Sequence, residues 1–540
     1  MPTDAWSLDS PMFPPLVLRP PHGPRLVRLL VMILAVLFYL PPAGWSPITN
    51  GPEGELASAA QDLLNHGGWS APADIALLHG PLALWLTRVS FALFGVNEFA
   101  ARLPAVLSVV AVVWVVLRMG ERFGTLWQGF VAALVLLCSP GMLSLGRMLT
   151  PFPLTAALLT ATVYCLQRGS ESRPTRRRWL ALAWGSWGLS TLAGGWAAGA
   201  IPAFTVLLLA IFYGEARLRF RSLLSWEGGL VFALTLALMT VSGFAPGGSL
   251  GAAPETVLPV GQLLCWQAGL LFPWSLLLLP ALGAVLVQFW FLRPLEWNEA
   301  LLLAWLAAGF AIALAEPTLF SPVLFWPAFA AWGAQRLKTM HRRTFLWGCA
   351  LTAVAACGGL SLTQHLRGVL PWLFPGKTEA LAAIPDFFWP AVMPVAFIAM
   401  LAFLLFAVAA FCAEILQNRR FALLALFAAM IPAGFAFADI GAKFAPYFSD
   451  AATAGSIDSR HEAHPVIFVD ASRFETSSLR FYLSEEARRN VRPCEADLQA
   501  VWKPPVFLVT SRSRLPHWKQ VLGDRLSVVS ESGEHLLLAP

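Results

Sequence analysis

The chain has 540 residues, of which 57% are hydrophobic and only 13% are charged, and its net charge is +6. Its mean hydropathy is +0.65. Water-soluble domains average about 25% charged residues, so this composition excludes a soluble globular protein and predicts a polytopic α-helical membrane protein. Basic residues separate the apolar segments, which suits membrane topology, and we expect no nucleic-acid partner.

Apolar runs long enough to cross a bilayer as helices recur after an N-terminal leader, residues 1–28. Between residues 29 and 439 the pattern predicts about thirteen transmembrane helices. They lie near 29–43, 103–118, 126–145, 152–167, 179–193, 195–213, 227–243, 263–290, 298–315, 322–335, 344–361, 387–413 and 421–438.

The basic clusters predict the orientation of these spans. Arg25 and Arg28 precede the first span, and the later clusters, such as 173–178 and 336–343, follow alternate spans. Every cluster therefore falls on the same side, as the positive-inside rule requires. With an odd number of spans, the N-terminus is expected in the cytoplasm and the C-terminus outside.

Two large pieces are then expected outside the membrane. In the first loop, 44–102, the apolar residues from Leu56 to Leu64 follow a helical period, which predicts an amphipathic juxtamembrane helix lying flat in the interface. In the tail, 440–540, "HPVIFVD", "PPVFLVTS" and "RLSVVSES…HLLLAP" are typical of short strands, with helices at "SSLRFYLSEEA" and "LPHWKQVLG". The tail is predicted to be a small soluble α/β domain without a nucleotide or nucleophile motif, and hence a recognition or scaffolding module.

Three segments carry a resemblance to a known family. The stretch "HGPLALWLTRVSFALFGVNEFAARLPAVL", 79–107, is similar to a K-P-P-L-x-x-W…L-F-G-x-N-E-F-A-A-R-L-P motif. The segments "GLLFPWSLLLLPAL", 269–282, and "FVDASRFETSSLRFYL", 468–483, match later parts of the same family. The chain therefore resembles the GT-C class of integral-membrane glycosyltransferases, and within it the aminoarabinose transferase and protein O-mannosyltransferase superfamily.

The resemblance implies an inverting transfer of a sugar from a polyprenyl-phosphate donor to a lipid, glycan or protein acceptor. The reaction would take place on the extracytoplasmic face of a bacterial inner membrane, in contact with membrane lipids. It needs a carboxylate that takes the acceptor's proton and basic groups that neutralise the departing phosphate. No cofactor is implied, and no cluster with metal-ligand spacing is present, so we expect no metal.

The sequence departs from the family pattern at the acidic positions. The first-loop motif D-E-x-x-Y-A is matched by "PEGELA", 52–57, where Pro52 replaces the aspartate. The motif T-D-x-x-L is matched by "TPFPL", 150–154, where Pro151 replaces the second aspartate. Asp and Pro both suit the first turn of a helix, so the exchange keeps the geometry and removes the ionisable group. Thr150 is then expected to cap a helix that starts at Pro151, and Asn50 to cap one that starts near Pro52.

The four lysines that the resemblance leads us to expect are also replaced. His79 stands at the first position and Gly194 at the second. Glu316 and Thr318 stand at the last two, which belong to one motif. His79 could contact a phosphate, although a histidine beside Gly80 and Pro81 is more often a turn residue.

The remaining candidates each have a functional and a structural interpretation. Glu53 or Glu55 could replace the missing base, or cap a helix on a solvated face. Arg147 could pair with a lipid phosphate, or extend its side chain to the interface. Arg102 could bind substrate, although an i, i+4 pair with Glu98 is the more favoured role.

Two functions remain open at this point. The first is an active transferase with a rewired site that uses Glu53 or Glu55 as base and Arg147 as phosphate partner. The second is a catalytically degenerate homologue that acts as a lipid-binding, regulatory or subunit protein. A transporter is less favoured, because neither intramembrane polar residues nor repeat symmetry is clear.

Overall fold

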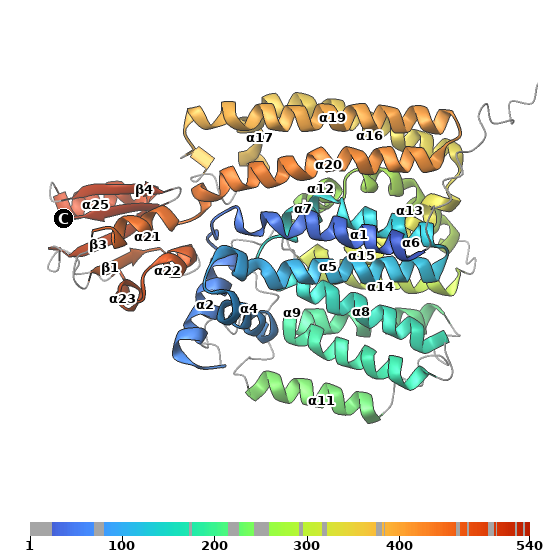
Figure 1. Cartoon of the computed structure of the whole chain (residues 1–540), viewed down its shortest axis with the longest axis horizontal. Coiled ribbons are helices and arrows are strands. Elements are labelled where there is room, and N and C mark those ends of the chain that lie inside the picture. Colours follow the sequence, from blue (N-terminus) through green and yellow to red (C-terminus); the bar gives the residue numbers. More distant parts are fainter. Residues whose placement is uncertain are drawn as a thin grey trace, which may run out of the picture.

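The structure of the protein is a computed structural model of mostly helical character (Figure 1). It describes residues 24–69, 80–171, 175–213, 226–241, 259–290, 295–315, 321–373, 381–382, 384–460, 465–471, 475–494, 502–503, 505–523, 526–532 and 535–540.

The long helices run side by side along the longest axis of the molecule, and the sheet lies at one end of this bundle (Figure 1). Within the described residues, seven helices are long and apolar enough to cross a membrane. A further pair, Val260–Leu270 with Trp274–Val287, is bent by 113° and would make eight if it forms one span. The predicted class, a polytopic helical membrane protein, is confirmed, and the number of thirteen spans stays a prediction.

The helices of the bundle have the following bounds: α1 (Pro24–Tyr39), α5 (Glu98–Phe123), α6 (Leu126–Leu137), α7 (Pro140–Leu145), α8 (Phe152–Glu171), α9 (Arg176–Phe212), α11 (Trp226–Val241), α12 (Val260–Leu270), α13 (Trp274–Trp290), α14 (Trp297–Ala315), α15 (Trp326–Thr339), α16 (Arg342–Gln364), α17 (Leu366–Leu373), α19 (Trp389–Ile415) and α20 (Arg419–Phe444).

Helix α9 contains a sharp break. Gly195 has φ 70° and ψ −163°, which divides the element at the point between the predicted spans 179–193 and 195–213. A positive φ of this size is open to glycine and strained for other residues. Two neighbouring predicted spans are therefore joined by a single glycine.

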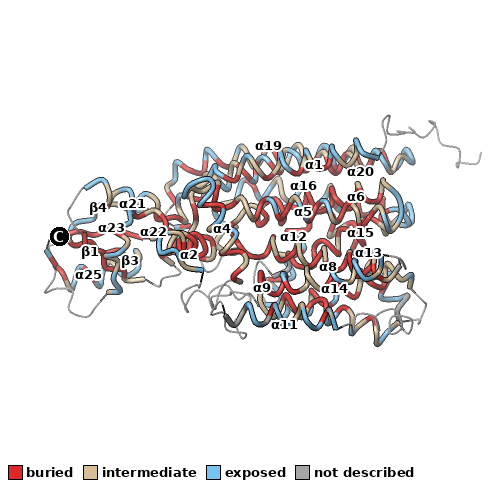
Figure 2. Tube along the Cα trace, turned by 60° about the horizontal axis from the view of Figure 1, so that its bottom comes forward, coloured by how far each residue is buried: buried red, intermediate tan, exposed pale blue. Residues whose placement is uncertain are grey.

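The first loop forms α2 (Pro52–His66) and α4 (Pro81–Phe94). The predicted helix is present, but its expected setting is wrong. Residues 53 to 60 are all buried, since α2 packs against α4 and against the tail (Figure 2). Protein therefore covers the surface that was predicted to lie against lipid and solvent.

The tail forms a five-stranded sheet with the order β2-β1-β3-β5-β4. Strands β1 (Val466–Asp470), β2 (Val491–Pro493) and β3 (Val506–Ser511) are parallel, while β4 (Ser527–Ser532) and β5 (His535–Ala539) are antiparallel to their neighbours. The helices are α21 (Ala451–Asp458), α22 (Ser477–Tyr482), α23 (Glu485–Arg489) and α25 (Leu515–Leu522). The predicted strand segments coincide with β1, β3, β4 and β5, and the predicted helical segments coincide with α22, α23 and α25. That the tail is a separate domain, and the side of the membrane on which it lies, stay predictions.

The first loop and the tail share an apolar core. Phe481 of α22 is buried in the same cluster as Leu56 of α2 and Phe91 of α4. The Phe91 and Phe481 rings lie 6.1 Å apart, centroid to centroid. This contact fixes the sheet-bearing tail against one end of the bundle (Figure 1).

Candidate functional site

Glu53 lies at the start of α2 with only 1% of its surface exposed. Its Oε1 accepts hydrogen bonds from Arg102 Nε at 2.8 Å and from the Leu149 backbone N–H at 3.0 Å. Its Oε2 accepts from Arg102 Nη2 at 3.0 Å, from the Thr49 N–H at 3.0 Å and from Thr49 Oγ1 at 2.9 Å. A carboxylate offers about four lone-pair positions, so these five donors leave none for a substrate proton.

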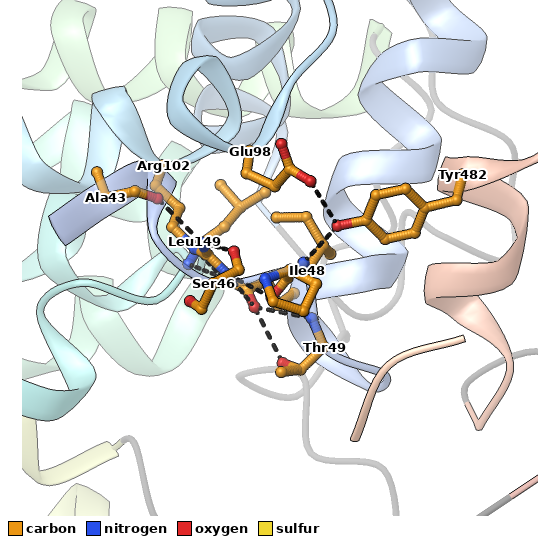
Figure 3. Close-up of polar contacts among 10 residues, drawn as sticks. Ala43, Ser46, Ile48, Thr49, Glu98, Arg102, Leu149 and Tyr482 are labelled. Carbon is orange, nitrogen blue, oxygen red and sulfur yellow. Dashed lines mark hydrogen bonds and ion pairs between the residues drawn. The ribbon is translucent and has the colours of Figure 1, made fainter. Parts of the chain in front are cut away.

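Arg102, at the start of α5, is also buried and uses its remaining donors on backbone carbonyls. They bond to the carbonyl oxygens of Ala43, Ser46 and Pro47 at 2.6 to 2.9 Å (Figure 3). The pairing predicted between Arg102 and Glu98 is wrong, because Glu53 from the first loop reaches the guanidinium. Arg102 thus links the segment 43–47 to the buried carboxylate at the start of α2.

The charge state of Glu53 follows from these neighbours. Burial opposes ionisation, but the Arg102 charge and the hydrogen bonds from Arg102, Thr49 and Leu149 outweigh it, and the pKa of Glu53 lies below its usual value. A carboxylate with a lowered pKa is a weak proton acceptor. The geometry therefore favours an anchoring role for Glu53, and its expected solvated setting is wrong.

Tyr482 of the tail completes this cluster from the other side. Its hydroxyl donates to Glu98 Oε1 at 2.9 Å and accepts from the Ile48 backbone N–H at 2.7 Å (Figure 3). Burial, together with the negative charge of Glu98, raises the pKa of Tyr482. Glu98 therefore accepts its hydrogen bond from the tail, while Arg102 donates its hydrogen bonds to Glu53.

Pro52, Pro151 and Gly194, which depart from the family pattern, lie close to the Glu53 cluster. Glu53, next to Pro52, bonds the backbone of Leu149, two residues before Pro151. The Pro151 carbonyl accepts from the Thr155 N–H at 3.0 Å, and a Cβ on Gly194 would come within 2.7 Å of the Thr155 side chain. A lysine at Gly194 would therefore not fit without a shift of α8.

Gly80, the residue after His79, lies against the chain beside Gly194. A Cβ on Gly80 would lie 2.1 Å from the Ala193 carbonyl oxygen, so the entry to α4 packs directly on the turn of α9. His79 itself, like Glu316 and Thr318, lies outside the described residues.

The two expected helix caps are wrong in detail. Helix α8 begins at Phe152, and Thr150 Oγ1 is buried with no hydrogen-bond partner among the described residues. Gly51, with φ 94°, is the N-cap of α2, and the Asn50 side chain bonds to the tail instead. The proline positions nevertheless lie at helix starts, as expected from the fixed φ of proline.

Arg147 follows α7 and has an unusual setting for a cation. Its Nη2 donates to the Phe38 carbonyl oxygen at 2.8 Å, and its Cζ lies 5.6 Å from the centre of the Tyr39 ring. Its Nε is buried without a hydrogen-bond partner, and no carboxylate of the described residues forms an ion pair with it. A guanidinium with unused donors and no counter-ion is suited to bind an anion.

Glu55 is buried with 3% of its surface exposed, two residues after Glu53 on α2. At about 100° per residue, the two side chains leave the helix about 200° apart, so they face different surroundings. The Glu55 backbone carbonyl accepts from Ser58 Oγ at 3.1 Å. Of the two glutamates, Glu55 is the one outside the Arg102 cluster.

Several members of the cluster carry no sequence signal. Thr49, Leu149 through its backbone, and Tyr482 come from separate parts of the chain, and only the fold brings them together.

Among the described residues, no group of three or more His, Cys, Asp or Glu side chains could hold a metal ion.

Known proteins share this fold and parts of this sequence. A family model described as dolichyl-phosphate-mannose-protein mannosyltransferase matches residues 78–242. The crystal structure of ArnT from Cupriavidus metallidurans bound to undecaprenyl phosphate superposes with a TM-score of 0.75 at 18% identity, covering 94% of this chain and 97% of that one. The chain therefore has the fold of the GT-C membrane glycosyltransferases.

The sequence relatives narrow the resemblance. The undecaprenyl phosphate-alpha-4-amino-4-deoxy-L-arabinose arabinosyl transferase 1 of Sodalis glossinidius (strain morsitans) is 26% identical over 380 residues, which are 64% of this chain and 65% of that protein. The corresponding transferase 2 of Proteus mirabilis (strain HI4320) is 25% identical over 199 residues, 35% of each chain. The aligned part of the chain thus spans less than two thirds of these relatives. The expected resemblance to the aminoarabinose transferase and mannosyltransferase superfamily is confirmed.

Proposed function

We propose that this protein is a membrane glycosyltransferase that moves a sugar from a polyprenyl-phosphate donor to a lipid, glycan or protein acceptor on the extracytoplasmic face. The GT-C fold and the family match at residues 78–242 support this class of reaction. The convergence of α2, the turn at 149–151 and the break in α9 supports this place for the site.

The observation that carries the proposal is Arg147. A half-buried guanidinium with a buried, unbonded Nε and no carboxylate partner among the described residues is costly in a membrane protein, and such residues are retained where an anion or a polar pathway compensates them. The phosphate of a lipid carrier has the oxygen geometry that a guanidinium binds with two parallel hydrogen bonds. Arg147 would hold the donor phosphate and stabilise it as it leaves.

Glu55 is the better candidate for the base, because Glu53 has no lone pair to spare. In the proposed step the acceptor's oxygen bonds to the anomeric carbon of the sugar while its proton passes to the Glu55 carboxylate. The bond between that carbon and the phosphate oxygen breaks, and its electron pair stays on the polyprenyl phosphate. Arg147 donates to the charge that develops there.

Two residues support the alternative function, a catalytically degenerate homologue. Pro52 and Pro151 cannot ionise, and both stand where relatives of this superfamily are expected to carry an acid. The alternative is a degenerate homologue that binds the lipid carrier and acts as a regulatory or subunit protein.

The test compares sugar transfer from polyprenyl-phosphate donors by the purified full-length protein and its variants. We expect E55Q to lose transfer while still binding polyprenyl phosphate, and R147A to lose binding. The control R489A removes an exposed arginine of the tail, whose ion pair among the described residues is with Glu485 one turn earlier, and should change neither property. Lipid binding without transfer by the wild type would favour the degenerate homologue, and R147A binding as the wild type does would refute the role of Arg147.

A further inference from the structure

The tail contacts the start of α2 through a buried polar network that neither helix capping nor the Arg102 cluster requires. We propose that the tail is a positioning device for the candidate site and that Asn50, Ser478 and Asp450 are its positioning residues. The catalytic consequence rests on the proposed function, whereas the mechanical role does not.

Asn50 is the centre of this network. Its Nδ2 donates to Asp450 Oδ2 at 2.9 Å. Its Oδ1 accepts from the Ser478 backbone N–H at 3.0 Å and from Ser478 Oγ at 2.6 Å. Its backbone N–H donates to the Phe448 carbonyl oxygen at 2.7 Å. Both ends of the amide are used, and only one orientation of it satisfies the carboxylate and the N–H together.

The next residue, Gly51, is held by the neighbouring serine. The Gly51 N–H donates to Ser477 Oγ at 2.9 Å, and Ser477 Oγ lies 3.0 Å from the Gly51 carbonyl oxygen, to which it donates. One turn of chain further, a Cβ on Gly54 would lie 2.6 Å from Ser477 Oγ. The same Cβ would lie 2.6 Å from the Ser478 backbone nitrogen, so the first turn of α2 packs directly on the start of α22.

The network continues into the centre of the tail's sheet. Asp450 Oδ1 lies 2.9 Å from His535 Nδ1 on β5, and the Asp450 backbone N–H donates to Ser478 Oγ at 2.9 Å. Asp450 and His535 are 1% and 2% exposed. A buried polar network with satisfied members specifies one arrangement of its elements, because a displaced member leaves a polar group unpaired.

The segment 48–53 is thus fixed from both sides. The tail holds Ile48 through Tyr482, and holds Asn50 and Gly51 through α22. The bundle holds Glu53 through Arg102. Glu55 follows one half-turn later, so its position depends on both sets of bonds. A displacement of about 1 Å at a catalytic group can cost about 100-fold in rate.

The discriminating variant is N50D in the full-length protein in lipid nanodiscs. It keeps the shape and the acceptor that faces Ser478, but it removes the donor to Asp450 and sets two carboxylates against each other. The double variant N50D/D450N returns a donor to that contact. S478A removes the hydroxyl without a change of charge. S456A is the control, because Ser456 Oγ donates to the Ala452 carbonyl oxygen of its own helix and to no other group of the described residues.

Hydrogen exchange of the α2 amides is the first readout and needs no activity. We expect N50D and S478A to speed exchange at residues 53–57 at least about tenfold, N50D/D450N to restore it, and S456A to leave it unchanged. Transfer is the second readout: kcat should fall in N50D while the donor KM stays, since the donor phosphate is not touched.

Wild-type exchange in both N50D and S478A would overturn the proposal, as would failure of D450N to rescue N50D. A wild-type protein without transfer would contradict the proposed function while the exchange result still decides this inference. Transfer at the wild-type rate in N50D with accelerated exchange would overturn the positioning role.

Discussion

Replacement of Glu53 by Gln tests the anchoring role of this residue most sharply, because the side chain keeps its size. Each carboxylate oxygen of Glu53 accepts at least two hydrogen bonds, from Arg102 and Leu149 on one side and from Arg102 and Thr49 on the other. Whichever way the new amide turns, its NH₂ group faces N–H donors. The donors at the site taken by the NH₂ group therefore lose their acceptor, and Arg102 loses its counter-charge.

The expected cost follows from the burial of the pair. A hydrogen bond to a charged group contributes about 1.5–3 kcal/mol, and removal of one partner of a buried ion pair costs about 3–5 kcal/mol. Arg102 and Glu53 are both almost fully buried, so solvent does not replace the lost partner. We expect E53Q to lower the free energy of unfolding by about 3–5 kcal/mol.

The assay is unfolding of the purified protein in detergent, followed by loss of the monomer peak in size-exclusion chromatography. E485Q is the matched control: Glu485 is exposed and forms an exposed ion pair with Arg489 in the next helical turn, so the loss of its charge should cost less than about 1 kcal/mol. A stability of E53Q equal to that of E485Q would refute the reasoning, because the five donors would then have another acceptor.

Three further predictions follow from the same contacts. The pKa of Glu53 is lowered on folding, so its contribution to stability is present above the unfolded value of 4.5 and is lost as the pH falls through the folded value. The free energy of unfolding, measured as the pH is lowered, should show this loss in the wild type and a weaker one in E53Q. G54A should destabilise the protein by about 1–3 kcal/mol by thermal unfolding, because its Cβ would meet Ser477 and Ser478, whereas G455A, with open space around it, should be neutral; equal stabilities would contradict the packing. Y482F should cost about 1–3 kcal/mol in the same assay, since Ile48 N–H and Glu98 lose a shared partner, and an unchanged midpoint would count against that bridge.

The membrane fold could be predicted from the sequence because its signals are local. Apolar length marks a span, and short continuous apolar runs bounded by turn signals mark the strands at 466–470 and 506–511. Even the break in α9 coincides with the short gap between two predicted spans. Each of these signals needs only one window of sequence.

The contacts of the candidate site join distant parts of the chain, so the local periodicity of the sequence does not predict them. Arg102 and Glu98 stand at helical i, i+4 spacing, which favours a local pair. The fold places a buried carboxylate 49 residues away against Arg102, and a tyrosine 384 residues away against Glu98. A desolvated partner with several backbone bonds outweighs an exposed neighbour in the next turn.

The setting of α2 was mispredicted for a related reason. Its sequence has an apolar face and a polar face, which is typical of an interfacial helix. The polar face is covered at Glu53, which meets Arg102, and partly covered at Asp62, which accepts from Arg488 Nη1 at 3.2 Å, whereas Asn65 and His66 at its end are exposed. Polar residues of a helix can therefore mark contacts with another domain as readily as contact with water.

A structure of the full-length protein with a polyprenyl phosphate in lipid nanodiscs would test the central claim most directly. The account predicts the phosphate within hydrogen-bond distance of the Arg147 guanidinium, with Glu55 facing the same cavity and Glu53 still bonded to Arg102. A phosphate bound elsewhere, with Arg147 paired to a protein carboxylate, would contradict it.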